Sequence, residues 1–184
     1  MSESRQSDLL QRLRADDVGA LDALLHQHWA EVLGYLTRWL GSRDAAEDLT
    51  QRTFLRIWER RRVLRPEGSL RGLLFSVARN LAMSEQRNQH ARQRAQSRYV
   101  ENTRAVAQPT ALDALQDAEL GEFLETAIRG LPVRRREVFI LRCVHGFSHR
   151  EIAAMMGISE QTVANQLSRA LSALRDALTD LQGS

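Results

Sequence analysis

The chain has 184 residues and a formal net charge of +3, with 43% hydrophobic residues, 5% aromatic residues and 3 Pro. This length suits one domain or two small ones, and a composition dominated by Leu and Ala favours helices over sheets. The single Cys143 excludes an internal disulfide and a cysteine-based zinc site, and we expect it to be a small core residue. Because no signal sequence or membrane-length apolar run is present, we expect a soluble, cytoplasmic protein without direct membrane insertion.

The front of the chain predicts two helices. Leucines within residues 9–13 indicate a short first helix. Either Asp16 or Asp17 caps a longer helix, because both are good N-cap residues. The apolar stripe of this second helix runs from residue 21 to residue 40, and Gly41 is expected to end it.

Two further helices follow, and they lie in the most basic part of the chain. A third helix is expected from about residue 44 to residue 62, and the break Pro66-Glu67-Gly68 follows it. Ser69 then caps a fourth helix. Residues 49–100 contain 12 Arg and only 3 acidic residues, a net charge of +9, whereas the segments before and after carry −4 and −2. Such a concentration of positive charge is typical of a site that binds a polyanion.

The second half predicts a tether and another helical block. From about residue 86 the apolar spacing fades, and the segment ends in Gln108-Pro109-Thr110, so we expect the tail of the fourth helix followed by a flexible linker. Helical spacing resumes near residue 111, and a further helix begins at Leu131-Pro132 and ends at Gly146. We therefore predict an all-α fold of two small helical domains, with a front domain at 1–90, a linker at 91–110 and a rear domain at 111–184.

Residues 148–171 indicate a helix-turn-helix within the rear domain. Ser148 and Glu151 have the spacing of a capping box, which starts a helix. Gly157 falls where the chain must turn, and Ser159 is a good N-cap for the next helix. The residues expected to be buried are Ile152, Ala153 and Met156 in the first helix, and Val163, Leu167, Leu171, Leu174 and Leu178 in the second.

The remaining face of the motif carries amide, hydroxyl and guanidinium groups, which read base edges and grip phosphates. We expect DNA contacts from Arg150, Gln161, Thr162, Asn165, Gln166 and Arg169. Two helices joined at a glycine also occur in plain helical bundles, whose exposed polar faces are merely solvated. The motif therefore indicates DNA binding, and the plain bundle stays open as the alternative at this point.

An enzyme or a metal protein is the first rival interpretation. His145 and His149 are four residues apart, and His26 and His28 are two apart, so a metal site can be imagined. Gly146 is expected to end a helix between the first two, which removes their shared face. No phosphate-binding loop, zinc-protease motif or nucleophile elbow is present, so we expect neither enzymatic activity nor a cofactor.

Both halves resemble the extracytoplasmic-function (ECF) sigma factors of bacterial RNA polymerase, within the sigma-70 family. Residues 44–58, which begin Asp44-Ala-Ala-Glu-Asp48, and residues 69–82, which begin Ser69-Leu-Arg-Gly72, together resemble region 2 of that family. Residues 131–142 and the helix-turn-helix resemble region 4. The segment from Thr162 to Leu171 is similar to the iron-citrate-type subgroup.

The resemblance implies a function for each half. Region 2 binds the polymerase and opens the −10 promoter element, and region 4 reads the −35 element. The linker passes through the polymerase towards its active site. The residues that match the polymerase-binding segment are Asp48, Gln51, Phe54 and Leu55, although Phe54 is equally well explained as a core residue. The residues implied at the −10 element are Arg62, Arg65, Arg71, Arg79, Asn80 and Arg87.

The chain departs from the family pattern at three positions within the segments that resemble region 2. Arg52 replaces a residue that is commonly acidic, which is expected to weaken or retune docking to polymerase. Leu70 and Leu73 stand where many relatives have Phe and Trp, so base stacking on these side chains is unsupported.

The expected partners are the RNA polymerase core enzyme, promoter DNA and an anti-sigma factor. The second rival is a stand-alone LuxR-like transcription regulator. It would account for residues 131–178 but leaves residues 44–82 without a function.

Overall fold

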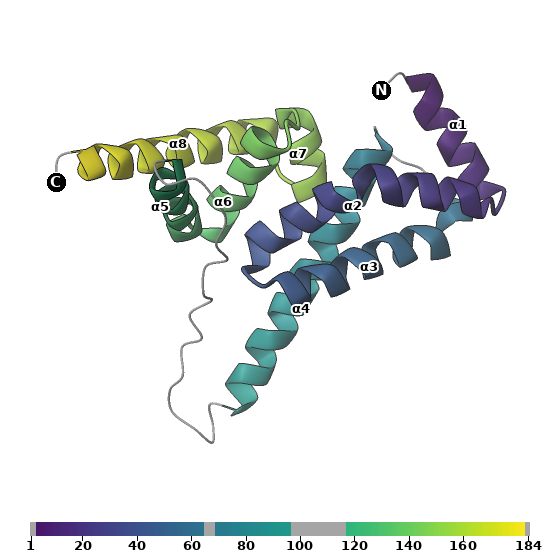
Figure 1. Ribbon diagram of the computed structural model, residues 1–184, viewed down its shortest axis with the longest axis horizontal. Coiled ribbons are helices and arrows are strands. Elements are labelled where there is room, and N and C mark those ends of the chain that lie inside the picture. Colours follow the sequence, from purple (N-terminus) through teal and green to yellow (C-terminus); the bar gives the residue numbers. More distant parts are fainter. Residues whose placement is uncertain (1–2, 65–68, 97–116, 183–184) are drawn as a thin grey trace. The chain divides into compact units, whose positions relative to one another are not determined.

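The computed structural model describes residues 3–64, 69–96 and 117–182, and every regular element in these ranges is helical (Figure 1). The chain divides into two compact units, Met1–Ala107 and Gln108–Ser184. The predicted all-α fold class is thus confirmed. Most of the segment that we interpreted as a linker, residues 91–110, lies outside the described residues, and its first six residues are helical.

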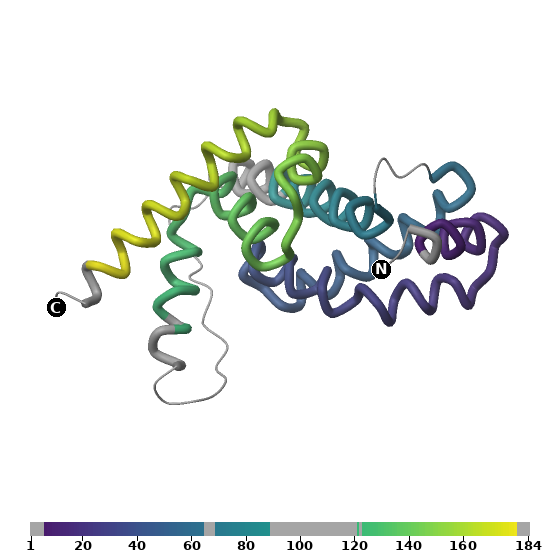
Figure 2. Tube along the Cα trace, turned by 90° about the horizontal axis from the view of Figure 1, so that it is seen from above, coloured from purple at the N-terminus to yellow at the C-terminus, as the bar shows by residue number. Residues whose placement is uncertain are grey.

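In its described residues, the front unit contains four α-helices and one short 3₁₀ turn. These are α1 (Glu3–Arg14), α2 (Val18–Leu40), α3 (Arg43–Glu59), the 3₁₀ turn η1 (Arg61–Val63) and α4 (Leu70–Gln96). Helices α2 and α3 run side by side, and α4 packs against both, as Figures 1 and 2 show. Helix α1 packs against the start of this bundle and contacts η1.

Local sequence signals set the helix ends of the front unit. The Asp17 side chain accepts a hydrogen bond from the Gly19 amide, so Asp17 rather than Asp16 caps α2. Gly41 ends α2 in the left-handed conformation, with φ of 72°, which glycine adopts without steric cost. Ser69 accepts a hydrogen bond from the Gly72 amide at 2.9 Å and caps α4 as predicted.

The core of the front unit contains an aromatic cluster. Tyr35 and Phe75 are completely buried, and their ring centroids lie 5.1 Å apart. Trp39, one turn along α2, places its ring 5.7 Å from Tyr35. Tilted pairs of this kind contribute about 0.5–1.5 kcal/mol beyond the burial of their area. The cluster therefore ties α2 to α4.

The rear unit is organised around its last helix. It comprises α5 (Asp117–Gly130), α6 (Val133–Phe139), the π-helical turn η2 (Ile140–Val144), α7 (His149–Met156) and α8 (Glu160–Gln182). Helix α8 packs against α5, α6 and α7. Leu131, Ala170 and Leu174 form one buried cluster at this junction.

The expectation that Cys143 lies in the core is wrong, because its side chain is exposed. The surrounding turn is π-helical, and the His145 amide bonds to the Ile140 carbonyl five residues earlier. This wider turn keeps Ile140 and Leu141 buried but places Cys143 and Val144 outside. Neighbouring protein atoms still desolvate the Cys143 thiol in part, which raises its pKa.

Two predicted apolar positions of the helix-turn-helix are also wrong. Met155 rather than Met156 is buried in α7. In α8, Ala170 is buried and Leu171 is 42% exposed. A helix turns about 100° per residue, so Leu171 is rotated about 80° from Val163, whereas Ala170 is rotated only about 20°. The true stripe therefore follows Ala170.

Helix α4 continues to Gln96, so the expected helical tail includes the first six residues of the segment interpreted as a linker. The segment beyond residue 86 is rich in Gln, Arg and Ala, which are good helix formers. The fading of the apolar spacing therefore did not mark the end of the helix.

Candidate nucleic-acid interface

The turn of the helix-turn-helix has the geometry that its sequence predicted. The Glu151 amide donates to Ser148 Oγ at 3.2 Å, and Glu151 Oε2 accepts from the Ser148 amide at 2.9 Å. Gly157 has φ of 64° and ends α7. Ser159 Oγ then accepts from the Thr162 amide at 3.1 Å, which starts α8. The predicted capping box and both turn residues are confirmed.

The first turns of α8 present a polar face. Gln161, Asn165 and Arg169 are exposed, and their spacing of four residues places them on one side of the helix. Gln161 Nε2 donates to Asn165 Oδ1 at 3.1 Å. This bond uses the oxygen of Asn165, so its two amide N–H groups can still donate to another acceptor. Of the flanking residues, Arg150 is exposed, and Thr162 and Gln166 are half-buried.

Helix α3 presents a second mixed surface in the front unit. Asp48, Gln51 and Leu55 are exposed, and the side chain of Leu55 is 58% accessible although it is apolar. The three lie at i, i+3 and i+7 and so share one face. An exposed leucine among polar groups is typical of a surface that contacts another protein.

Phe54 does not belong to that surface, so its assignment as a polymerase contact needs correction. It is 3% exposed and stacks on Trp29, with ring centroids 5.8 Å apart. A buried ring packs the core that carries the surface and cannot itself touch a partner in this conformation. The core alternative for Phe54 is therefore the one that agrees with the structure.

Arg52 adds a positive charge beside this surface. Its guanidinium lies 3.3 Å from the Asp48 carboxylate on the same helix and 4.0 Å from that of Glu85 on α4. The negative charge of Asp48 is therefore partly offset. The ion pair of Arg52 with Asp48 arises because Arg52 stands at a position that is commonly acidic in the family.

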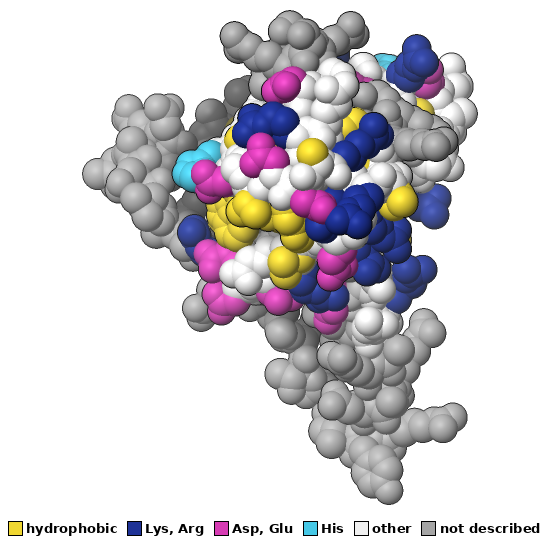
Figure 3. Space-filling view, turned by 90° about the vertical axis from the view of Figure 1, so that its right-hand side faces the viewer, with side chains coloured by type: hydrophobic (Ala, Val, Ile, Leu, Met, Phe, Trp, Pro, Cys, Tyr) yellow, Lys and Arg dark blue, Asp and Glu magenta, His cyan; other side chains and the backbone are white. Residues whose placement is uncertain are grey.

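Two of the basic residues expected at DNA are already bonded within the front unit. Arg62 is exposed but pairs with Asp16, and the pKa of that carboxyl is lowered by its hydrogen bonds from Arg62 and Arg61. Arg71 is half-buried and pairs with Glu31 of α2. Figure 3 shows that arginine and acidic side chains are interspersed on this side of the molecule.

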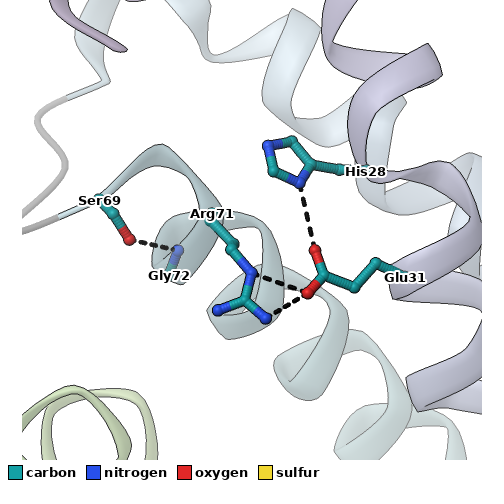
Figure 4. A network of polar contacts seen from close by, with 5 residues as sticks. All are labelled: His28, Glu31, Ser69, Arg71 and Gly72. Carbon is teal, nitrogen blue, oxygen red and sulfur yellow. Dashed lines mark hydrogen bonds and ion pairs between the residues drawn. The ribbon is translucent and has the colours of Figure 1, made fainter. Parts of the chain in front are cut away.

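The Arg71 pair belongs to a small polar network, drawn in Figure 4. Arg71 Nε donates to Glu31 Oε1 at 2.8 Å, and the ring of His28 lies 3.3 Å from Glu31 Oε2. His28 is 5% exposed, and its burial lowers the pKa of the imidazole. The Arg71 guanidinium also lies 5.3 Å from the Phe75 ring. Arg71 thus ties the first turn of α4 to α2.

Three of the four remaining −10 candidates lie along α4. Asn80 and Arg87 are exposed and seven residues apart, so they share a face of the helix. Arg79 is half-buried, and Arg65 lies outside the described residues. Leu70 is buried and Leu73 is half-buried.

Sequence reasoning missed Asp16 and Glu31 as the acidic partners of two candidate DNA-contacting arginines. Asp16 contacts arginines 45 and 46 residues away, and Glu31 contacts Arg71 40 residues away. No local pattern joins such distant positions. The one available signal was the excess of acidic residues before residue 49 opposite the excess of arginines after it.

Metal binding and membrane spanning receive no support from the described part of the chain. Within it, no three His, Cys, Asp or Glu side chains form a group that could hold a metal ion. No described helix is both long and apolar enough to cross a membrane.

Comparison with protein families places a different match on each unit. The family described as Sigma-70 region 2 matches residues 24–92, and the one described as Sigma-70, region 4 matches residues 124–174. The first match lies within the front unit and the second within the rear unit.

Individual relatives cover nearly the whole chain. The ECF RNA polymerase sigma factor SigL of Mycobacterium tuberculosis is 32% identical over 171 residues, which are 91% of this chain and 93% of SigL. The ECF RNA polymerase sigma factor SigE of Mycolicibacterium smegmatis is 32% identical over 158 residues. That match covers 85% of this chain but only 61% of SigE.

Solved structures share the fold. The sigma factor RpoE, in complex with the anti-sigma factor NepR from Bartonella quintana, matches with a TM-score of 0.70 and 23% identity, over 86% of this chain and 96% of that one. CnrH, in complex with the cytosolic domain of CnrY, matches with a TM-score of 0.68 and 21% identity, over 95% and 97%. At these identities the likeness speaks for the fold alone.

Proposed function

Because this chain belongs to the ECF sigma factors of the sigma-70 family, we propose that it directs RNA polymerase to specific promoters. In this role it binds the core enzyme, recognises the −35 element and opens the −10 element. The observation that carries the proposal is the occurrence of regions 2 and 4, in that order, on two separate units. The domain limits 1–90, 91–110 and 111–184 remain our proposal.

For the −35 element we propose that α8 enters the major groove. Gln161, Asn165 and Arg169 form the reading face, because an amide bonds adenine bidentately and a guanidinium bonds guanine. Arg150, Thr162 and Gln166 flank this face and contact the backbone or neighbouring bases. Their exposure on one side of α8 and at the start of α7 supports this assignment.

For polymerase docking we propose the face of α3 formed by Asp48, Gln51 and Leu55. Its support is the 58% exposure of Leu55 between two polar neighbours. Phe54 acts beneath this face as its packed support. Arg52 weakens the attraction that Asp48 offers to a basic partner, because the two charges lie 3.3 Å apart.

For the −10 element we propose that the basic surface of the front unit contacts the backbone. Asn80 and Arg87 supply an exposed edge on α4, with Arg79 beside them. Arg62 supplies an exposed guanidinium at η1, whereas Arg71 contributes by fixing the start of α4. A phosphate-binding surface of this kind is required before an unpaired strand can be held.

We also propose an anti-sigma factor as a regulatory partner. The family resemblance suggested it, and RpoE of Bartonella quintana, whose fold this chain shares, was solved with one. Because its partners are polymerase and DNA, the protein is proposed to act in the cytoplasm and without enzymatic activity of its own. Membership of the iron-citrate-type subgroup stays a prediction from residues 162–171.

The alternative of a LuxR-like regulator is disfavoured by the match of residues 24–92 to region 2. Transcription with purified components separates the two functions. The full chain is combined with core polymerase on sheared genomic DNA of its own source, and the 5′ ends of the transcripts are sequenced. We expect start sites that share a two-part upstream motif and that core polymerase alone does not use. Absence of such transcripts, together with failure to co-purify with core, would rule out a sigma factor.

Leu55→Asp provides the matched variant for this experiment. Its exposure makes the substitution harmless to folding, whereas a carboxylate in an apolar contact must be desolvated. We expect association with core to weaken at least about tenfold, which corresponds to about 1.4 kcal/mol. Val63→Asp serves as the control, because Val63 is 75% exposed outside the proposed docking face.

A further inference from the structure

The corner between α1 and α2 holds the arginines of η1. Asp16 lies at this corner with φ of 60°, a conformation that is uncommon outside glycine. Its Oδ1 accepts from Arg61 Nε at 2.5 Å and from Arg62 Nε at 3.4 Å, and its Oδ2 accepts from Arg62 Nη2. One carboxylate thus serves two guanidinium groups from a distant part of the chain.

The two arginines differ in how firmly they are held. The Arg61 guanidinium stacks 4.1 Å from the centre of the Trp58 ring, donates to the Trp58 carbonyl at 2.6 Å, and is only 19% exposed. The side chain of Arg62 is 69% exposed, and it donates hydrogen bonds to Asp16. Arg61 is therefore a structural residue, whereas Arg62 can exchange its partner without disturbing the core.

The backbone around this corner is separately anchored. Arg14 donates to the Leu64 carbonyl, which joins α1 to the end of η1, and Leu64 is 7% exposed. Asp17 caps α2 and pairs with Arg12 at 2.8 Å. Because these contacts fix the corner and the turn, the contact between Asp16 and Arg62 is the part that can open.

A carboxylate and a phosphate bind a guanidinium in the same bidentate way. We propose that Asp16 is a positioning residue that holds Arg62 and thereby withholds it from the backbone phosphates of DNA of any sequence. The inference rests on the proposed function, which makes η1 part of the DNA-contacting surface. Asp16 then lowers affinity for DNA of any sequence, so stable binding depends more on the base contacts made elsewhere.

Substitution of Asp16 tests the competition directly. Asp16→Asn removes the charge, and asparagine tolerates positive φ. Asp16→Gly is measured beside it, because glycine adopts this conformation without strain. Asp8→Asn changes the net charge equally at an exposed position of α1 and is the control. The probe is a fluorescent duplex of mixed sequence with a single-stranded tail, and binding of the full chain is followed by anisotropy over a salt series.

We expect both Asp16 variants to bind the probe roughly two- to fivefold more tightly than the wild type, the range for an exposed ion pair. The slope of log affinity against log salt should steepen by about 0.9, because one more phosphate is neutralised. Asp8→Asn should leave the slope unchanged. In an Arg62→Ala background, Asp16→Asn should have no further effect.

Either of two results would overturn the inference: Asp16 variants that match Asp8→Asn, or a gain that persists in the Arg62→Ala background. A change in salt slope separates the inference from a purely structural role, which would lower thermal stability without altering the slope. The proposed function is tested apart from this, by wild-type transcription with core polymerase. Loss of that activity would refute the sigma role, whereas an unchanged slope beside normal transcription would refute only the role of Asp16.

Discussion

The two units carry their polar side chains in different ways. In the rear unit, the proposed reading face comes from successive turns of α8, and the side-chain bond within it, from Gln161 to Asn165, is local. In the front unit, Arg62 and Arg71 are bonded to acids 46 and 40 residues away. Some arginine side chains of the front unit therefore join helices through ion pairs. An arginine count alone would overstate the charge that this unit offers to DNA.

The largest expected effect is that of Glu31→Ala, which removes one of the ion pairs that join helices in the front unit. This change leaves Arg71 and the buried His28 without their shared acceptor, as Figure 4 makes clear. Loss of a buried partner costs about 1–3 kcal/mol. We expect the front unit to lose that much stability in denaturant unfolding. Glu47→Gln, which removes an exposed pair with Arg43, should cost less than about 0.5 kcal/mol. Similar costs for both variants would show that the network is not structural.

Asn165→Ala tests the rear unit, where the polar side chains are expected to read bases. Binding of the polymerase complex to its promoter should weaken by about 1–3 kcal/mol, and the loss should be confined to one base position of the −35 element. The measurement is a titration against promoters that are substituted singly at each position. An equal loss on every sequence would mean that Asn165 touches only the DNA backbone.

Ser148→Ala tests the rear unit further, because it weakens a helix cap that acts only within α7. It removes the acceptor for the Glu151 amide at the start of α7. Loss of an N-cap costs about 0.5–2 kcal/mol, so the rear unit should melt earlier while the front unit is unaffected. Hydrogen exchange followed residue by residue separates the units. Equal loss of protection in both would contradict a local role of the Ser148 cap.

The smallest expected effect concerns pH and His28. Burial lowers the pKa of this imidazole below its usual 6.5, against the opposing attraction of Glu31. As the pH falls below 6.5, the unfolded chain binds the proton first, so stability falls. His28→Gln should flatten this part of the stability–pH curve, measured by denaturant unfolding at each pH. A curve unchanged by the substitution would assign the acid sensitivity to other groups.

Local features of the fold were predicted well from the sequence. The helix starts at Asp17, Ser69 and Ser148 and the ends at Gly41 and Gly157 agree with the structure, because caps act within a few residues. Errors arose where burial depended on helix geometry. Cys143 is exposed by a π-helical turn, and Leu171 is exposed by the drift of a four-residue spacing.

The candidate sites divide along the same line. Spacing alone was enough to group Gln161, Asn165 and Arg169 on one face of a helix, and to group Asp48 with Leu55 on another. It was not enough to decide whether Phe54 faces a partner or the core, because both positions suit an aromatic ring. Only the packing of Trp29 against it resolves that choice.

The amino-acid sequence by itself determined the helices, the two helical blocks and the motifs that identify the family, since each depends on residues close together in the chain. Tertiary structure alone decided which arginines are already paired, because Asp16 and Glu31 meet their partners only after α1, α2 and α4 have packed. The physical reason is the short range of hydrogen-bonded ion pairs. Such a contact forms only when folding brings two distant side chains within a few ångströms. The periodicity of the sequence does not predict which distant side chains will meet.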